Sequence, residues 1–209
     1  MVYIVIEGPD GTGKTTQARL LAKRLLLEGR PARYVHEPGQ TLMGLELEKI
    51  IKNRSLARQA QTDLLLFTAN RIEVFSQVIQ PSLRNGEVVV ADRNWLSSAA
   101  YQGIAGGIGI AEVQKETAKW LPKEYVHPTF TILLYLPESQ HQVMLTGRGT
   151  SEKDYFESKP EAFLQKIKEG YQKAGELCLP NRYARVEASG AIEEVHGRIL
   201  AALRQKAII

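Results

Sequence analysis

A glycine-rich segment near the start of the chain restricts the fold more than any other feature of the sequence. The segment is Gly8-Pro9-Asp10-Gly11-Thr12-Gly13-Lys14-Thr15, which fits the pattern G-x-x-x-x-G-K-[ST] in full. An apolar, β-branched run over residues 2–6 precedes it, and a helical pattern over residues 14–28 follows it. Such a match arises by chance in about one in a hundred chains of this length, but seldom between a strand and a helix. We therefore predict a phosphate-binding loop.

The chemistry of this loop follows from its backbone. Glycines allow successive N–H groups to point into one concavity, and the start of the next helix adds positive potential, so the loop binds anions. Lys14 would lie against the β- and γ-phosphates, and the hydroxyl of Thr15 would ligate Mg²⁺. The residues expected to contact ATP here are Gly8, Pro9, Asp10, Gly11, Thr12, Gly13, Lys14, Thr15 and Thr16. The loop alone does not distinguish a kinase from a GTPase or a motor ATPase.

Apolar runs and helical patterns alternate along the whole chain. Strands are predicted over residues 2–6, 33–36, 87–91, 129–136 and 183–186. Helices are predicted over residues 14–28, 42–51, 62–80, 110–120, 138–146, 160–177 and 191–206. This alternation predicts the α/β fold of P-loop nucleoside triphosphate hydrolases, with a doubly wound, five-stranded parallel sheet and helices on both faces. At 209 residues, the chain is expected to form one domain, residues 1–209.

An acidic residue, Asp92, and a basic residue, Arg93, follow the apolar run Val88-Val89-Val90-Ala91. In an open parallel sheet, ligands bind outside the carboxyl ends of the strands. Asp92 would therefore face the phosphate loop and could hold Mg²⁺ directly or through water. The planar guanidinium of Arg93 could reach a phosphate. The structural alternative is that Asp92 caps the next helix and Arg93 is solvated.

Charge and composition exclude several classes of protein. Lys and Arg number 27 against 23 Asp and Glu, and no basic run reaches five residues, so we expect no nucleic-acid-binding face. No apolar run approaches the ~18 residues of a membrane span. No secretory signal is visible either, so a cytoplasmic location is expected. Cys178 is the only cysteine, which excludes an internal disulfide and a Cys-based zinc site; its apolar neighbours predict a buried structural thiol.

Four segments together resemble the thymidylate kinase family, in the same order and over nearly the whole chain. The segment from Ile4 to Gln17 is similar to the opening of that family. Residues 37–41 (EPGQT) resemble its EPGGT loop, and residues 66–71 (LFTANR) resemble its LFxAxR helix. Asp92-Arg93 and residues 97–103 (SSAAYQG) resemble its DR(Y/H)…S-x-x-AYQG motif. In combination, these motifs are far more specific than the phosphate loop alone.

The resemblance implies transfer of the γ-phosphoryl group of ATP to dTMP, with Mg²⁺, in a homodimer that could use the 62–80 helix. Phe67 and Arg71 share one helix face, so the ring would stack on thymine while the guanidinium donates to its O4. Ser98 and Tyr101 would touch the base edge and crowd the position of a ribose 2′-OH.

The same resemblance assigns the sugar and phosphate contacts. Asp10 would accept a hydrogen bond from the 3′-OH, Pro38 would pack by the base, and Arg93 would clamp the monophosphate. The substrate-binding residues implied in this way are Asp10, Glu37, Pro38, Phe67, Arg71, Arg93, Ser98, Tyr101 and Gln102.

Residues 147–157 are the candidate lid, with small residues flanking two cations. Gly11 and Thr12 stand where one branch of the family carries an arginine, so the chain resembles the bacterial-type branch with its catalytic arginine in the lid. Arg148 is then expected to contact ATP and to join Lys14 and Arg93 as a catalytic cation, with Lys153 in support. The sequence departs from the family at Asp154-Tyr155-Phe156-Glu157, where a D-R-x-E motif is usual, and also at Asn94 and Gln40.

Three alternatives remain open on the sequence, besides a nucleic-acid-dependent ATPase, which the modest net charge disfavours. A deoxynucleoside kinase would need a base for the 5′-OH, and Glu37 could serve. A pyrimidine monophosphate kinase could prefer another base. A P-loop ATP-binding switch would bind nucleotide without acceptor-dependent turnover; the set around Phe67, Arg71 and Tyr101 argues against it, because a switch has no use for a second nucleotide pocket.

Overall fold

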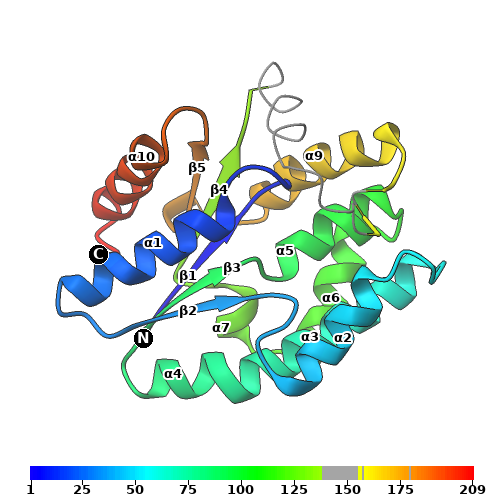
Figure 1. The fold of residues 1–209 in the computed structure, drawn as a ribbon, viewed down its shortest axis with the longest axis horizontal. Helices are drawn as coiled ribbons and strands as arrows, with labels where there is room; N and C mark the ends of the chain where they lie inside the picture. Colours follow the sequence, from blue (N-terminus) through cyan, green and yellow to red (C-terminus); the bar gives the residue numbers. More distant parts are fainter. Residues whose placement is uncertain (138–154, 157, 179) are drawn as a thin grey trace.

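The five predicted strands form one parallel sheet. In the computed structural model of the protein, the described residues are 1–137, 155–156, 158–178 and 180–209. The strand order is β2-β3-β1-β4-β5 (Figure 1), which is doubly wound as predicted. The strands are β1 (Val2–Glu7), β2 (Ala32–His36), β3 (Val88–Asp92), β4 (Phe130–Tyr135) and β5 (Tyr183–Glu187).

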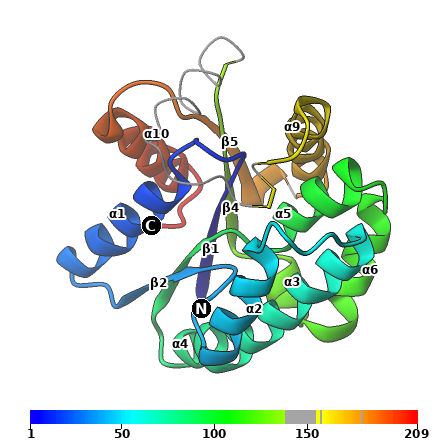
Figure 2. The ribbon, with the colours of Figure 1, turned by 45° about the vertical axis from the view of Figure 1, so that its right-hand side comes forward.

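Helices cover both faces of the sheet (Figure 2). On one face lie α1 (Lys14–Leu27) and α10 (Ile192–Gln205). On the other lie α2 (Leu42–Lys52), α3 (Ala60–Val74), α4 (Gln80–Arg84), α5 (Trp95–Ser98), α6 (Ile110–Trp120), α7 (Lys123–Val126) and α9 (Glu161–Glu176). Because strand side chains alternate, Ile4 and Ile6 pack in the core under α1 and α10, whereas Tyr3 and Val5 pack in the core of the opposite face.

Two segments differ from the regular α-helices that the sequence predicts. The expected 62–80 helix starts at Ala60, changes to a π-helical turn over Phe75–Ile79 and continues as α4. Pro81, which has no N–H to donate and clashes with the carbonyl four residues earlier in a regular helix, lies two residues after the end of this turn. A second π-helical segment, Ala99–Ala105, follows α5. The expected 138–146 helix lies outside the described residues.

Three neighbouring strands, β1, β2 and β3, end at the same level of the sheet. Ile6 of β1 and His36 of β2 both pair with Asp92 of β3. The ladder extends one step further, because the N–H of Arg93 donates to the carbonyl of Ile6 and the N–H of Glu37 donates to that of Asp92. The loops that leave these strands therefore start at the same edge of the sheet.

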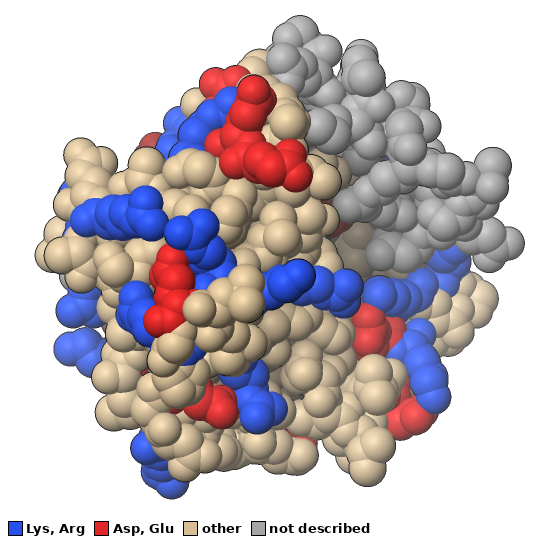
Figure 3. Space-filling view, turned by 60° about the vertical axis from the view of Figure 1, so that its left-hand side comes forward, with Lys and Arg blue, Asp and Glu red and all other residues tan. Residues whose placement is uncertain are grey.

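Surface charge is mixed on the face drawn in Figure 3, where Lys and Arg side chains are interspersed with Asp and Glu. Within the described parts of the chain, no helix combines the length and the apolar character that crossing a bilayer requires. Cys178 is half-buried rather than fully buried, and it packs against the core beneath α9. Burial raises the pKa of its thiol to about 11, as suits a structural cysteine.

Candidate active site

The phosphate loop joins β1 to α1 and closes around one lysine. Gly8 has φ 146°, and a Cβ there would lie 2.3 Å from the carbonyl oxygen of Leu134, so only glycine fits. Lys14 begins α1 with its side chain buried; its Nζ donates to the carbonyl of Pro9 at 2.9 Å and lies 3.6 Å from Asp10 Oδ1. The pKa of Lys14 is lowered to about 8, mainly by burial and secondly by the nearby charge of Arg93. The carboxylate of Asp10 opposes this shift.

The two predicted magnesium ligands meet at this loop. The hydroxyl of Thr15 donates to Asp92 Oδ2 at 2.5 Å, and the buried Asp92 Oδ1 has no hydrogen-bond partner among the described residues. Asp92 does not cap the following helix: Asn94 does, by accepting from the N–H of Leu96 at 2.9 Å. In the described part of the chain, no three His, Cys, Asp or Glu side chains cluster as metal ligands. A hydroxyl and one carboxylate with a spare oxygen fit Mg²⁺, which takes one or two protein ligands beside phosphates.

Arg93 lies immediately after β3, in the left-handed region at φ 77°. Its Nη1 donates to Ser97 Oγ at 3.1 Å and to Tyr171 Oη at 2.8 Å, and its Nη2 pairs with Asp10. The hydroxyl of Tyr101 donates to the same carboxylate at 2.6 Å. Asp10 thus joins the predicted phosphate and sugar contacts in one cluster.

Arg71 extends from α3 beneath a second part of the site. It is 1% exposed, and each of its three nitrogens has an acceptor. Nε donates to Glu37 Oε2 at 3.1 Å, Nη1 to Ser98 Oγ at 2.9 Å and Nη2 to the carbonyl of Asn94 at 2.9 Å. Its guanidinium also lies over the ring of Phe67, 5.3 Å from the centroid. The predicted base-binding pair is therefore assembled and fixed.

Glu37 is the buried partner of Arg71. Its Oε2 also accepts from the hydroxyl of Tyr125 at 2.7 Å, and its Oε1 has no partner among the described residues. Burial raises the pKa of this carboxyl to about 7, against the opposing effects of Arg71 and Tyr125. Its contacts place this carboxyl group beside Arg71, in the part of the site formed by Phe67 and Arg71.

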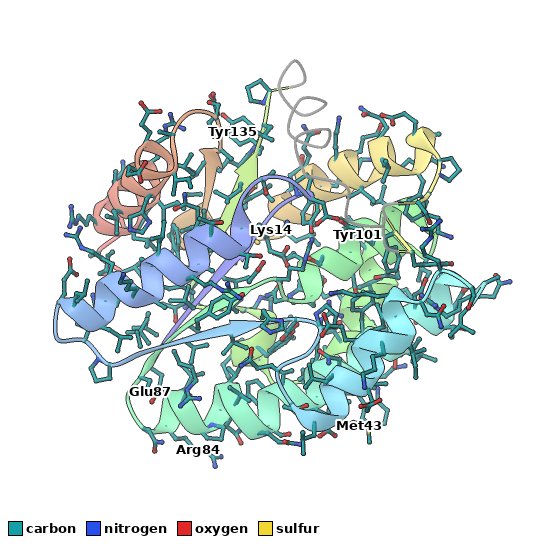
Figure 4. The ribbon with its side chains drawn as sticks, in the orientation of Figure 1. Lys14, Met43, Arg84, Glu87, Tyr101 and Tyr135 are labelled. Carbon is teal, nitrogen blue, oxygen red and sulfur yellow. The ribbon has the colours of Figure 1, made fainter. Side chains whose placement is uncertain are left out.

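One cavity of about 410 Å³ joins the two parts of the site. Asp10, Thr15 and Asp92 line one end, and Phe67 and Arg71 line the other. Lys14, at the start of α1, and Tyr101, from the opposite helical layer, lie at the same edge of the sheet (Figure 4), and Asp10 contacts both. The remaining predicted substrate contacts on the cavity wall are Glu37, Pro38, Arg93, Ser98, Tyr101 and Gln102.

Known proteins resemble this chain along most of its length. A family model described as thymidylate kinase matches residues 6–199. Proteins named thymidylate kinase from Leifsonia xyli subsp. xyli and Chlamydia muridarum are 36% and 35% identical to it, over 95% and 90% of this chain and 92% and 91% of their own lengths. The chain belongs to the thymidylate kinase family. A crystal structure of thymidylate kinase from Ehrlichia chaffeensis matches with a TM-score of 0.77 at 24% identity, over 97% of this chain and 98% of that one, and confirms the P-loop fold.

Thymidylate kinase motifs locate most of the cavity wall but miss Phe156 on that wall and two residues that contact the Arg93 turn from outside the cavity. Phe156 also lines the cavity, with its ring centroid 5.9 Å from that of Phe67 and 5.5 Å from that of Tyr101. The aromatic pair at the end of the expected lid was a signal for it. Tyr171 and Glu7 contact the Arg93 turn; Tyr171 is 78 residues from Arg93 in the chain, and no spacing rule connects them. The predicted lid residues Arg148 and Lys153 lie outside the described residues.

Proposed function

We propose that this member of the thymidylate kinase family transfers the γ-phosphoryl group of ATP to dTMP and forms dTDP and ADP. The observation that carries the proposal is the single cavity that reaches from the phosphate loop to the pair formed by Phe67 and Arg71. A donor held by the loop and a pyrimidine held by that pair would meet end to end within it. Positioning of this kind supplies most of the catalysis in phosphoryl transfer.

The phosphate end supplies cations. Lys14 would bind the β- and γ-phosphates, while the loop amides of Gly8–Thr15 and the start of α1 hold the other donor oxygens. Arg93 would bind the acceptor phosphate, whose attacking oxygen is already ionised at neutral pH, so no general base is needed. Arg148, with Lys153 in support, would add charge from the lid.

Thr15 and Asp92 would hold Mg²⁺, and the hydrogen bond between them supports that role because it brings the hydroxyl and the carboxylate together. When bound, the metal neutralises charge on the β- and γ-phosphate oxygens. The buried, unpartnered Oδ1 of Asp92 is the group that such an ion, or a water bound to it, would satisfy.

The base end supplies specificity. Phe67 would stack on thymine, Arg71 would donate to its O4, and Ser98 and Gln102 would border its edge. Gln102 Oε1 is buried without a partner in the described structure, which suits an acceptor waiting for a ligand N–H. Asp10 would accept from the 3′-OH, and Tyr101, fixed on Asp10, would crowd a ribose 2′-OH. Pro38 and Glu37 would complete the wall.

We further infer that residues 1–209 act as one kinase domain, in the cytoplasm and as a homodimer. We assign the dimer contact to α3 from the family resemblance; Leu65 on that helix has an exposed side chain, 56% accessible.

The test is ADP formation from Mg-ATP with dTMP, dUMP, dCMP, AMP, GMP or free thymidine as the acceptor. We expect dTMP to give the fastest turnover. If dTMP yields no more ADP than buffer, the proposal is wrong; faster turnover with thymidine would identify a deoxynucleoside kinase, and faster turnover with another monophosphate a different base preference. Binding of ATP without turnover on any acceptor would indicate a switch.

A further inference from the structure

We propose that Glu7 is a positioning residue for phosphoryl transfer: acting through Ser97 and Tyr171, it orients the hydrogen-bond acceptors that hold the guanidinium of Arg93. The inference rests on the proposed function, because it assigns Arg93 to the acceptor phosphate. Glu7 itself does not line the substrate cavity, and its effect is indirect.

The sheet places Glu7 under the turn that follows β3. Glu7 is the last residue of β1, and alternation along the strand directs it to the same face as Tyr3 and Val5. Its side chain is fully buried, with 0% exposure. A buried carboxylate is costly unless all its acceptor sites find donors. The nearest donors lie on the segment from Asn94 to Ser97.

Three hydrogen bonds tie Glu7 to that segment. Oε1 accepts from the backbone N–H of Asn94 at 2.7 Å and from that of Ser97 at 3.1 Å. Oε2 accepts from the hydroxyl of Ser97 at 2.8 Å. These bonds fix the backbone directly after Arg93, whose φ of 77° is unfavourable for a residue with a side chain. The carboxylate therefore helps to hold Arg93 in its left-handed conformation.

The hydroxyl protons follow from the same bonds. Ser97 has one proton, and it points to Glu7, so its oxygen can only accept from its other neighbours. Tyr171 Oη, 2.9 Å from Ser97 Oγ, must then donate to Ser97. Both hydroxyls consequently present lone pairs to Arg93 Nη1, which donates to Ser97 at 3.1 Å and to Tyr171 at 2.8 Å. The buried carboxylate of Glu7 thus sets which group donates and which accepts in the hydrogen bonds that lead from Ser97 to Arg93.

The same turn connects the two arginines of the site. Arg71 donates to the carbonyl of Asn94, while the N–H of Asn94 donates to Glu7. The peptide segment held by Glu7 is thus bound on its other side by the arginine proposed to read the base. A displaced turn would disturb Arg93 first, because two of its acceptors depend on the Ser97 hydroxyl.

Glu7→Gln tests the inference with almost no change in shape. The amide NH₂ would donate to Ser97 Oγ, reverse the Ser97 proton and direct it towards Arg93 and Tyr171. We expect kcat with dTMP to fall about 10- to 100-fold, as for the loss of a charge-assisted hydrogen bond, with the KM for ATP unchanged. Asp63→Asn is the matched control: it neutralises another buried carboxylate, paired with Arg58 at 2.7 Å, outside the site. It should leave kcat near the wild-type value.

A double-mutant cycle separates positioning from general destabilisation. In an Arg93→Ala background, Glu7→Gln should have little further effect, because the group it positions is gone. An undiminished loss in that background would overturn the inference, as would wild-type kcat in folded Glu7→Gln. If Glu7→Gln does not fold, Tyr171→Phe retains Glu7 and removes one acceptor of Arg93; it should lower kcat about tenfold, and full activity would contradict us. A wild-type protein inactive on dTMP would instead reject the proposed function.

Discussion

The two ends of the cavity hold their arginines in different ways. At the base end, Arg71 is 1% exposed and all three nitrogens donate to acceptors on three separate residues. At the phosphate end, the side chain of Arg93 is 19% exposed and shares the Asp10 carboxylate with Lys14 and Tyr101. The first arginine is part of the core, and the second belongs to a partly exposed cluster of charges on the cavity wall, in which Lys14 itself is buried.

This difference separates stability from chemistry. Removing one partner of a buried ion pair strongly destabilises the fold, because the other charge is left buried without compensation. A partly exposed cluster is screened by water and contributes less to folding, but its cations are accessible to phosphate groups. We therefore expect substitutions at the base end to affect both folding and dTMP recognition, and those at the phosphate end to affect mainly turnover.

The largest effect should come from Lys14→Met. Removing the cation expected to neutralise developing charge should lower kcat by about 10³-fold or more, because electrostatic stabilisation of the transition state is usually the largest catalytic contribution. The free energy of unfolding should change little, since methionine fills a similar volume. Turnover and urea denaturation measure the two effects. Substantial turnover in the folded variant would remove Lys14 from the phosphate end.

Arg71→Ala and Arg93→Ala test the contrast directly. Arg71→Ala should lower the free energy of unfolding by about 3 kcal/mol, because it leaves Glu37 buried beside an empty space. Arg93→Ala should cost no more than about 1 kcal/mol. Denaturant titration measures both. In binding assays, Arg71→Ala should weaken the binding of dTMP more than the binding of ATP. The comparison would fail if both variants lost equal stability, or if Arg71→Ala lost equal affinity for dTMP and for ATP.

The lowered pKa of Lys14 predicts a pH dependence of ATP binding at the phosphate end. The amine is protonated below about pH 8, where it attracts phosphate, and becomes neutral as the pH rises through that value. ATP binding should therefore weaken above pH 8, by up to about tenfold per pH unit, and binding should take up a proton. Calorimetry in two buffers measures both. Lys14→Arg, which keeps its charge, should lose this dependence, whereas a Kd independent of pH in the wild type would contradict the assignment.

The smallest effect concerns Gln40 in the loop at the base end. Gln40 has φ 70°, where glycine is favoured, but its side-chain oxygen accepts from the N–H of His36 at 3.2 Å. Gln40→Ala keeps the strain and loses the bond, whereas Gln40→Gly loses both. The glycine variant should therefore be more stable than the alanine variant by about 1 kcal/mol. Thermal unfolding compares them, and the reverse order would show that this backbone is not strained.

The sequence predicts the parts of the site that depend on local pattern. The phosphate loop, the acid at the end of β3 and the pair Phe67–Arg71 each depend on short spacings, and the structure brings all of them to one cavity. The sheet follows from the apolar runs, because buried parallel strands need them.

Local sequence pattern does not predict contacts between residues that lie far apart in the sequence. Tyr171 and Glu7 meet at Ser97 only because α9 packs beside the π-helical segment Ala99–Ala105, and no propensity rule predicts a π-helical turn. The proton direction that gives Glu7 its proposed role depends on three-dimensional hydrogen bonding, which composition and spacing do not encode.

The common endpoint of β1, β2 and β3 bears on how such enzymes diverge. Asp92 and the start of the phosphate loop are spaced by backbone pairing between adjacent strands, and no loop sets that separation. Loops at the rim can therefore lengthen or change composition over generations while the donor geometry stays constant. Acceptor preference should drift more readily than ATP use, and inherited variation that spares function should gather at the rim rather than in the strands.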